Sequence, residues 1–348
     1  MKLTIYTPSY WPKIGGLETI SQIIATECAG LECDVTVLTD DLLLNTDARA
    51  EENNVKIVRT KYFKSMLSTF SESDVILFMN ISLKILPIAI ASRKPIVLSH
   101  HIDYSDKKLK NKILSFVKRT ITIFFSNIYV SSYISKKMFG RGCIIPNAYD
   151  SNIFYQENNI IKKVDFVFCG RIVSDKGVNI LIEAFQELLQ KFPCATLLII
   201  GDGEEKNRLE KLTQKLNLQK NIIFAGILQG KELGNRLREC RCMVVPSLWK
   251  EPFGIVALEG LACCDYVIAT DQGGLPEALG GLGLLSKPDK DDLAMKMLSV
   301  MAYINDESNE NIIEKNLVKE KKEKFLIKHH PKKVAQDYLN FCFSKVKR

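Results

Sequence analysis

Short apolar runs alternate with amphipathic segments along most of this chain. In the first half, the runs typical of strands lie at residues 3–6, 35–38, 75–79, 96–99 and 128–131. Helical patterns lie between them at residues 17–29, 83–91 and 109–124. Strands that are buried on both faces of a sheet are continuous apolar runs, so this alternation predicts an α/β fold with a doubly wound parallel sheet.

The same rhythm occurs a second time after an interruption. Residues 146–150 form a turn cluster, and residues 155–163 are mostly polar, as expected of a linker. Strand patterns then follow at residues 164–169, 195–200, 222–224, 243–245 and 266–269. Helical patterns follow at residues 178–192, 204–216, 232–240, 253–263 and 291–303.

A chain of 348 residues with two such series is expected to form two domains, which we place at residues 1–158 and 159–331. Beyond them, Pro331 interrupts a charged helical tail, so two helices are expected there. Ligands of parallel sheets bind outside the carboxyl ends of the strands. A ligand held between the two halves is therefore the natural expectation.

The composition, 46% apolar and 25% charged residues, is that of an ordinary soluble globular protein. A net charge of +8 favours acidic partners, such as phosphates or an anionic membrane surface. The sequence has no 18-residue apolar run, and residues 1–6 resemble a first strand more than a signal peptide. The ten cysteines include no CxxC pair, which favours reduced thiols in a cytoplasmic protein over a structural zinc site.

The segment from Glu251 to Glu259, Glu-Pro-Phe-Gly-Ile-Val-Ala-Leu-Glu, carries the most specific chemistry. Pro252 and Gly254 indicate a loop that turns into a helix, so Glu259 is expected within the helix and Glu251 just before it. The two acids then span at most about 12 Å by helical rise. This spacing favours two separate grips on hydroxyl groups over a single carboxylate dyad.

Glycines recur where predicted strands end. They are Gly15 and Gly16, Gly170, Gly201 and Gly203, and Gly273 and Gly274. Such loops let backbone amides approach an anion, and the helix that follows adds partial positive charge. The first loop is not a GxGxxG fingerprint, so a nicotinamide cofactor is not expected; a tight turn is the structural alternative.

Two cations and a histidine lie at other predicted strand ends. Arg171 and Lys176 are suited to hold a diphosphate and to neutralise its charge as it leaves, although both also fit an ordinary surface. His101 is able to donate to a substrate oxygen or a phosphate, or to serve as a polar loop residue. Asp202 is expected either to cap a turn or to line a nucleotide site.

Metal and nucleic-acid sites find little support in the sequence. Asp289 and Asp291 have the spacing of a metal-binding acid pair, but they open a helix and are interpreted as capping residues. Residues 107–119 form a basic helical pattern, which suits either an anionic membrane or an ordinary surface. The pattern lacks aromatic interleaving of the kind used to stack bases, so nucleic acid is not expected.

Taken together, these motifs resemble family 4 of the retaining glycosyltransferases, within the glycosyl transferases of group 1. The resemblance covers most of the chain and is most specific between residues 167 and 285. The segments that carry it are 170–177, 201–203, 246–247, 251–259 and 273–277, together with 15–18, the strand that ends at His101, and 146–150. It departs from the family at Ala148, where glycine is usual, and at Cys263–Asp265.

The resemblance implies a GT-B fold, with two Rossmann-like domains facing a central cleft and residues 332–348 packing back on the first. It implies that Arg171 and Lys176 hold the donor diphosphate opposite Gly15 and Gly16, and that Glu259 binds the ribose. Glu251 would bind the donor sugar and His101 would lie beside the reacting centre. The remaining donor-binding residues implied are Gly170, Gly201, Asp202, Phe253, Gly254 and Ile255.

The implied activity is retaining, metal-independent transfer of a sugar from a nucleotide-sugar, with UDP favoured, to a hydroxyl of a glycan or lipid-linked acceptor. The nucleotide-sugar is a substrate, so no cofactor is expected. The resemblance to the family, together with the basic segment, implies a bacterial surface polysaccharide or lipopolysaccharide pathway, with the protein in the cytoplasm or peripheral on the inner face of the cytoplasmic membrane. A nucleotide-sugar 2-epimerase and a non-catalytic nucleotide-sugar-binding protein are the alternatives.

Overall fold

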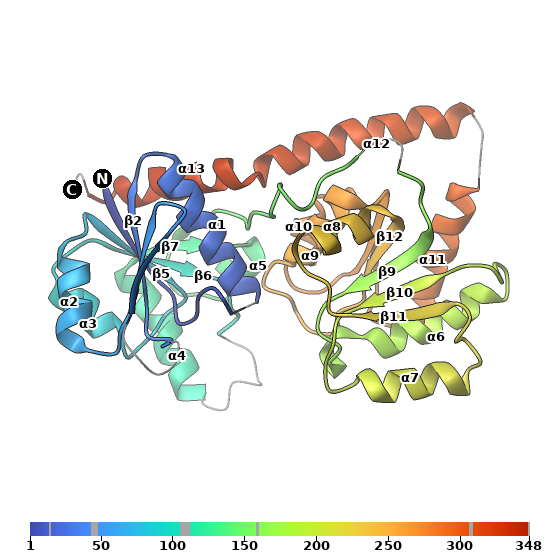
Figure 1. The fold of residues 1–348 in the computed structure, drawn as a ribbon, viewed down its shortest axis with the longest axis horizontal. Coiled ribbons are helices and arrows are strands. Elements are labelled where there is room, and N and C mark those ends of the chain that lie inside the picture. Colours follow the sequence, from blue (N-terminus) through green and yellow to red (C-terminus); the bar gives the residue numbers. More distant parts are fainter. Residues whose placement is uncertain (14, 43–47, 105–111, 158–159, 306–308, 347–348) are drawn as a thin grey trace. The chain divides into compact units, whose positions relative to one another are not determined.

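The structure is a computed structural model that describes residues 1–13, 15–42, 48–104, 112–157, 160–305 and 309–346. The chain divides into two compact units (Figure 1). Unit 1 comprises residues 1–148 and 329–348, and unit 2 comprises residues 149–328. The expected boundary at residues 158 and 159 lies outside the described residues.

Unit 1 is built on an eight-stranded sheet, in which only β3 is antiparallel to its neighbour. Across the sheet the strands are β3 (Ala48–Glu52), β4 (Val55–Arg59), β2 (Asp34–Thr39), β1 (Lys2–Tyr6), β5 (Val75–Met79), β6 (Ile96–His100), β7 (Ser126–Tyr129) and β8 (Gly142–Ile144). The five strands predicted for this half are confirmed within a few residues. Strands β3, β4 and β8 were not predicted.

Helices cover both faces of the unit 1 sheet, as a doubly wound topology requires. They are α1 (Gly16–Gly30), α2 (Phe63–Ser71), α3 (Leu86–Ala91), α4 (Lys112–Ile121), α5 (Ser132–Ser135) and α13 (Pro331–Phe343), with a 3-10 turn at Thr122–Phe124. Helix α13 packs against α1 although it lies at the other end of the chain (Figure 1). Its Tyr338 hydroxyl lies 2.8 Å from Ser99 Oγ in the interior of the unit.

Unit 2 contains a six-stranded sheet in which every pair is parallel. Across the sheet the strands are β11 (Ile222–Gly226), β10 (Leu197–Ile200), β9 (Val164–Cys169), β12 (Cys240–Val245), β13 (Tyr266–Thr270) and β14 (Leu284–Ser286). The predicted α/β class with doubly wound parallel sheets is therefore confirmed in both units.

The helices of unit 2 lie in two layers, one on each face of its sheet (Figure 1). One layer contains α6 (Val178–Leu189), α7 (Lys206–Lys215) and α11 (Lys290–Ile304), and the other contains α8 (Gly230–Arg238), α9 (Ile255–Cys263) and α10 (Leu275–Leu279). Helix α12 (Asn309–Lys328) follows and contacts α9. Among the helices of the described ranges, none is both long and apolar enough to cross a membrane.

Candidate functional site

The loops at the carboxyl ends of β9 and β10 lie against each other through their backbones. Gly170 N donates to Ile200 O at 3.0 Å, and Ile172 N donates to Asp202 O at 2.8 Å. Gly201 has φ of +137°, and a Cβ there would lie 1.9 Å from Gly170 O. Glycine is therefore required at position 201, because any side chain would force the two loops apart.

A second close approach joins the loop after β9 to the loop after β12. The 3-10 turn Ser174–Lys176 ends at Gly177, which has φ of +69°. A Cβ on Gly177 would lie 2.0 Å from Pro246 O. Asp175 O accepts hydrogen bonds from the backbone amides of Leu248 and Trp249, which lie 2.9 and 3.1 Å away.

This approach brings Lys176 and Glu251 together. Lys176 Nζ lies 2.5 Å from Glu251 Oε1, with the two side chains 21% and 13% exposed. Ser247 Oγ also donates to Glu251 Oε1, at 2.9 Å, and Thr270 Oγ1 donates to Ser247 O at 2.6 Å. Both charged residues were predicted as site residues but not as an ion pair, and Ser247 was named only within a segment that carries the family resemblance, with no role given.

The start of helix α9 is held by the loop that follows β13. Gly254 precedes the helix with φ of +103°, and a Cβ there would lie 2.5 Å from Leu275 Cδ2. Gly274 N donates to Glu251 O at 2.7 Å, while Phe253 is buried. The expected arrangement, with Glu251 before the helix and Glu259 within it, is confirmed, and Ile255 is the first helical residue.

Glu259 lies one turn before the end of α9 and is partly buried. In the described part of the chain, its carboxylate has no hydrogen-bond or ion-pair partner. Burial, and secondarily the charge of Asp150, raises the pKa of Glu259 to about 7. A partly buried carboxylate with no donor among the described residues is well suited to accept hydrogen bonds from ligand hydroxyls, because such bonds offset the cost of its desolvation.

Arg171 and Asp202 lie at the same ends of the strands but are exposed. The guanidinium of Arg171 forms no ion pair with any described residue, so it is free to bind an anion. Asp202 Oδ1 accepts from Gly203 N at 2.7 Å, and its Oδ2 lies 3.8 Å from Lys206 Nζ. Asp202 therefore caps its own turn, which was the structural alternative in the sequence analysis.

The predicted glycine loop of unit 1 shows less steric constraint than those of unit 2. Helix α1 begins at Gly16, which is exposed, and a Cβ there would have no neighbour within 4 Å. A Cβ on Gly15 would approach only the flexible end of Glu18. The fold therefore does not require glycine at either position.

His101 follows β6 in unit 1 and is held by polar neighbours. Its Nε2 lies 2.9 Å from Ser99 Oγ, and its backbone N donates to Asn80 Oδ1 at 2.7 Å. Burial, and secondarily neighbouring His100, lowers the pKa of His101 to about 3. The imidazole is therefore neutral at physiological pH, so it is suited to hydrogen bonding rather than to neutralising a phosphate.

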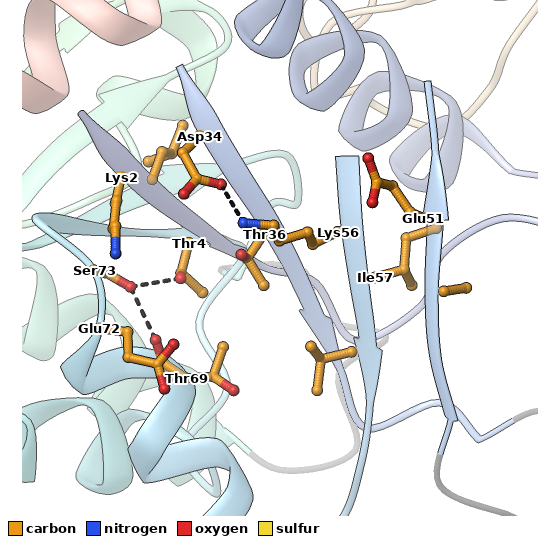
Figure 2. Close-up of a pocket in the computed structure, with 13 residues that line it drawn as sticks. Lys2, Thr4, Asp34, Thr36, Glu51, Lys56, Ile57, Thr69, Glu72 and Ser73 are labelled. Carbon is orange, nitrogen blue, oxygen red and sulfur yellow. Dashed lines mark hydrogen bonds and ion pairs between the residues drawn. The ribbon is translucent and has the colours of Figure 1, made fainter. Parts of the chain in front are cut away.

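Unit 1 also has a pocket of about 420 Å³ (Figure 2). It lies near the amino ends of β1, β2 and β4, whereas His101 follows the carboxyl end of β6. Some of the pocket's polar side chains pair with one another. Lys56 Nζ lies 2.9 Å from Asp34 Oδ1, and the hydroxyls of Thr4 and Ser73 are 2.5 Å apart. This pocket contains none of the predicted site residues.

A family model described as glycosyl transferases group 1 matches residues 151–333. An uncharacterized glycosyltransferase of Methanocaldococcus jannaschii is 35% identical over 177 residues, which are 50% of this chain and 47% of that protein. The gpi3 subunit of Schizosaccharomyces pombe phosphatidylinositol N-acetylglucosaminyltransferase is 30% identical over 46% of this chain and 36% of its own length. The chain thus matches less than half of the length of these curated relatives.

Among solved structures, Anabaena HepE in complex with UDP-glucose is similar over 99% of this chain and 100% of its own. The TM-score is 0.77 and the sequence identity is 20%. A likeness at this identity is evidence of fold alone, and it confirms the predicted GT-B fold.

Proposed function

Because the chain belongs to the glycosyl transferases group 1 family, we propose that it is a retaining glycosyltransferase that transfers a sugar from a nucleotide-sugar to a hydroxyl group. The observation that carries the proposal is the ion pair of Lys176 and Glu251, which joins the loops at the carboxyl ends of β9 and β12, with Glu259 on the helix that follows. Ligands of parallel sheets bind at this edge.

In the proposed complex, Arg171 and Lys176 bind the donor diphosphate. Lys176 then exchanges its ion pair with Glu251 for contacts with the phosphates, which releases Glu251 to accept hydrogen bonds from the donor sugar. The backbone amides of residues 253–255 and the glycine loops at Gly170 and Gly201 complete the donor site. Glu259 accepts hydrogen bonds from the ribose hydroxyls.

The proposed reaction breaks the bond between the anomeric carbon and the diphosphate oxygen, and it forms a bond from the same face to the acceptor oxygen. The acceptor proton passes to the departing phosphate oxygen. None of the site residues is placed as a covalent nucleophile, which favours this route over a double displacement. Fixed cations stabilise the charge that develops on the leaving group, so the proposed chemistry needs no metal ion.

The assignment of Lys176 is tested by Lys176→Ala, which should lower the rate of transfer on the order of 10²-fold or more. Thr213→Ser, a conservative change in α7, is the matched control and should leave transfer unchanged. Transfer by Lys176→Ala at close to the wild-type rate, in protein with unaltered thermal stability, would exclude the proposed role.

UDP is the proposed nucleotide, and the complex of HepE with UDP-glucose supports this choice. For the acceptor we propose a lipid-linked glycan, as in bacterial surface polysaccharide or lipopolysaccharide synthesis. Two observations support a lipid acceptor. One is the similarity to a subunit of a phosphatidylinositol N-acetylglucosaminyltransferase, and the other is the exposed apolar and basic surface of α4. A thermal-shift screen of nucleotides tests the donor, because a ligand at 100 times its Kd should add about 2.7 kcal/mol of stability.

The surface formed by α4 and the turn after it combines exposed apolar side chains with cations. Ile113, Phe116 and Phe124 are 76%, 60% and 77% exposed, and none of the α4 residues is buried. Lys112 and Arg119 lie on the same helix. The basic pattern predicted at residues 107–119 falls partly on residues outside the described ranges, and the remaining part supports peripheral contact with an anionic membrane.

Sedimentation with vesicles tests this contact. Wild-type protein should bind vesicles that contain anionic lipid, and binding should weaken as salt increases. Phe116→Ser should reduce binding without changing transfer to a soluble acceptor. Absence of salt-sensitive binding would count against the membrane and the lipid acceptor, but not against the transferase activity.

A nucleotide-sugar 2-epimerase is the second candidate, since the same architecture and donor contacts would serve it. The two are distinguished by incubating the protein with the donor alone. An epimerase forms a new free sugar without any acceptor, whereas a transferase requires one for turnover beyond slow hydrolysis. Binding without either reaction would indicate a non-catalytic nucleotide-sugar-binding protein.

A further inference from the structure

Besides the pocket in unit 1, the structure has a pocket of about 820 Å³ in unit 2, at the amino ends of β12, β13 and β14. It is lined by the starts of these strands, by residues of the preceding segment such as Lys162, and by side chains of α11 and α12. The strands of this sheet are parallel, and the proposed donor loops follow their carboxyl ends. The pocket therefore lies at the opposite edge of the sheet from the donor site.

The lining of this pocket carries an excess of positive charge. Six cationic side chains line it, against the two acids Glu157 and Asp265: Lys162, Arg238, Arg241, Lys319, Lys321 and Lys322. Part of this charge is compensated: the Cys263–Asp265 segment contacts two of the lysines, and Arg241 Nε lies 3.6 Å from Asp165 Oδ1. Lys162 Nζ lies 3.2 Å from Asp265 Oδ1, and Lys322 Nζ donates to Cys264 O at 2.7 Å.

Arg238 supplies an unused donor. It is 3% exposed, and its Nη1 donates to Ile153 O at 2.9 Å. Among the residues that the structure describes, none forms a hydrogen bond with its buried Nε. The nearest acid, Glu157 Oε2, is 3.5 Å from that Nε and belongs to a side chain that is 54% exposed. An anion in the pocket would satisfy Nε, and the exposed Glu157 is able to move aside for it.

The remaining wall is apolar and partly aromatic. The rings of Tyr266 and Tyr303 meet edge to face with centroids 5.8 Å apart. Val267, Leu282 and Val300 also line the pocket. A volume of this size and a mixture of apolar walls with a few charged groups are typical of sites for small organic ligands.

We propose that this pocket binds a small organic anion, a phosphate or carboxylate that carries an apolar group. The anionic end contacts Arg238 and Arg241, and the apolar group packs on the tyrosine rings. The assignment is independent of the proposed transferase function, since none of these residues belongs to the donor site. A merely solvated basic groove is the alternative, and it predicts weak binding that depends on charge alone.

Calorimetric titration with octyl phosphate tests the proposal, with saturating UDP present so that the donor loops are occupied. Octyl phosphate should bind at least tenfold more tightly than inorganic phosphate or octyl glucoside. Arg241→Gln and Lys321→Gln, at positions that are not buried, should each weaken binding at least threefold. Phe116→Ser on the α4 surface is the matched control and should leave binding unchanged.

A second measurement reports directly on the buried donor. In protein labelled with ¹⁵N-arginine, octyl phosphate should shift the Nε–H resonance of Arg238 but not that of Arg171. Competition by phosphatidate vesicles would identify a lipid as the source of the anion, and no competition would identify a soluble metabolite. The proposal is overturned if Arg238 does not respond, if both glutamine variants bind as tightly as wild type, or if inorganic phosphate binds equally well.

Discussion

Replacing Glu259 by glutamine should abolish the pH dependence of nucleotide-sugar binding below pH 7. Burial, and secondarily Asp150, raises the pKa of Glu259 from 4.5 to about 7 in the structure. At about 1.4 kcal/mol per pH unit, ionising this carboxyl costs about 3 kcal/mol more than ionising it in water. Ribose hydroxyls that donate to the carboxylate favour its ionised form, so binding should lower the pKa again.

The sign of the effect follows from proton release. Between pH 4.5 and pH 7, the free protein holds a proton on Glu259 that the complex does not, so affinity rises with pH through this window and is constant above it. If the pKa in the complex returns to about 4.5, affinity for UDP-glucose should be about tenfold weaker at pH 6 than at pH 8. His101 does not contribute, because its pKa is about 3.

Isothermal titration calorimetry with UDP-glucose at pH 6, 7 and 8 measures this difference. The ligand is suitable because its pyrophosphate is esterified at both ends and does not titrate in this range. Asp150→Asn removes the secondary cause of the raised pKa, so its affinity should begin to fall only at a lower pH than in wild type. Equal affinity of the wild-type protein at pH 6 and pH 8, or the same pH dependence in Glu259→Gln, would refute the reasoning.

Two further substitutions test the fold that supports the site. Gly201→Ala should destabilise unit 2 by more than about 2 kcal/mol and abolish donor binding, because its Cβ would lie 1.9 Å from Gly170 O. Gly30→Ala, where a Cβ would have no neighbour within 4 Å, should fold normally, and equal urea midpoints for the two variants would contradict this account. Asp289→Ala removes the cap whose side chain accepts from Asp292 N and should cost about 1 kcal/mol in urea unfolding, whereas Asp289→Asn should retain most of that stability.

Most strands of the two sheets and the position of α9 were predictable because they depend on local pattern; β3, β4, β8 and β14 were not predicted. Buried parallel strands such as β5 and β9 are continuous apolar runs, and both were predicted with the observed bounds. The capping role of Asp289 was also predictable, since a cap acts within one turn of its helix. Strand β3, Ala-Arg-Ala-Glu-Glu, was missed because an edge strand needs no apolar run.

The contacts within the candidate site depend on loops that are distant in sequence, and here the sequence was less informative. Lys176 and Glu251 meet only because Gly177 allows the backbone to approach Pro246. Glycines recur at several strand ends, which is typical of close backbone contacts, but their positions in the sequence do not identify which loops contact each other. Nothing in the local pattern around Arg238 distinguished a buried arginine from one on the surface.

The membership of α13 in unit 1 has a consequence for dissecting the protein. A fragment that stops at residue 148 would lack the helix that covers α1, and Ser99 would lose its bond to Tyr338. Such a fragment would expose Cys28, which is now fully buried and whose Sγ lies 3.9 Å from Ala335 O of α13. Unit 1 is thus formed by two segments that are far apart in the sequence. Expressing it alone therefore requires a linker that joins residues 1–148 to residues 329–346.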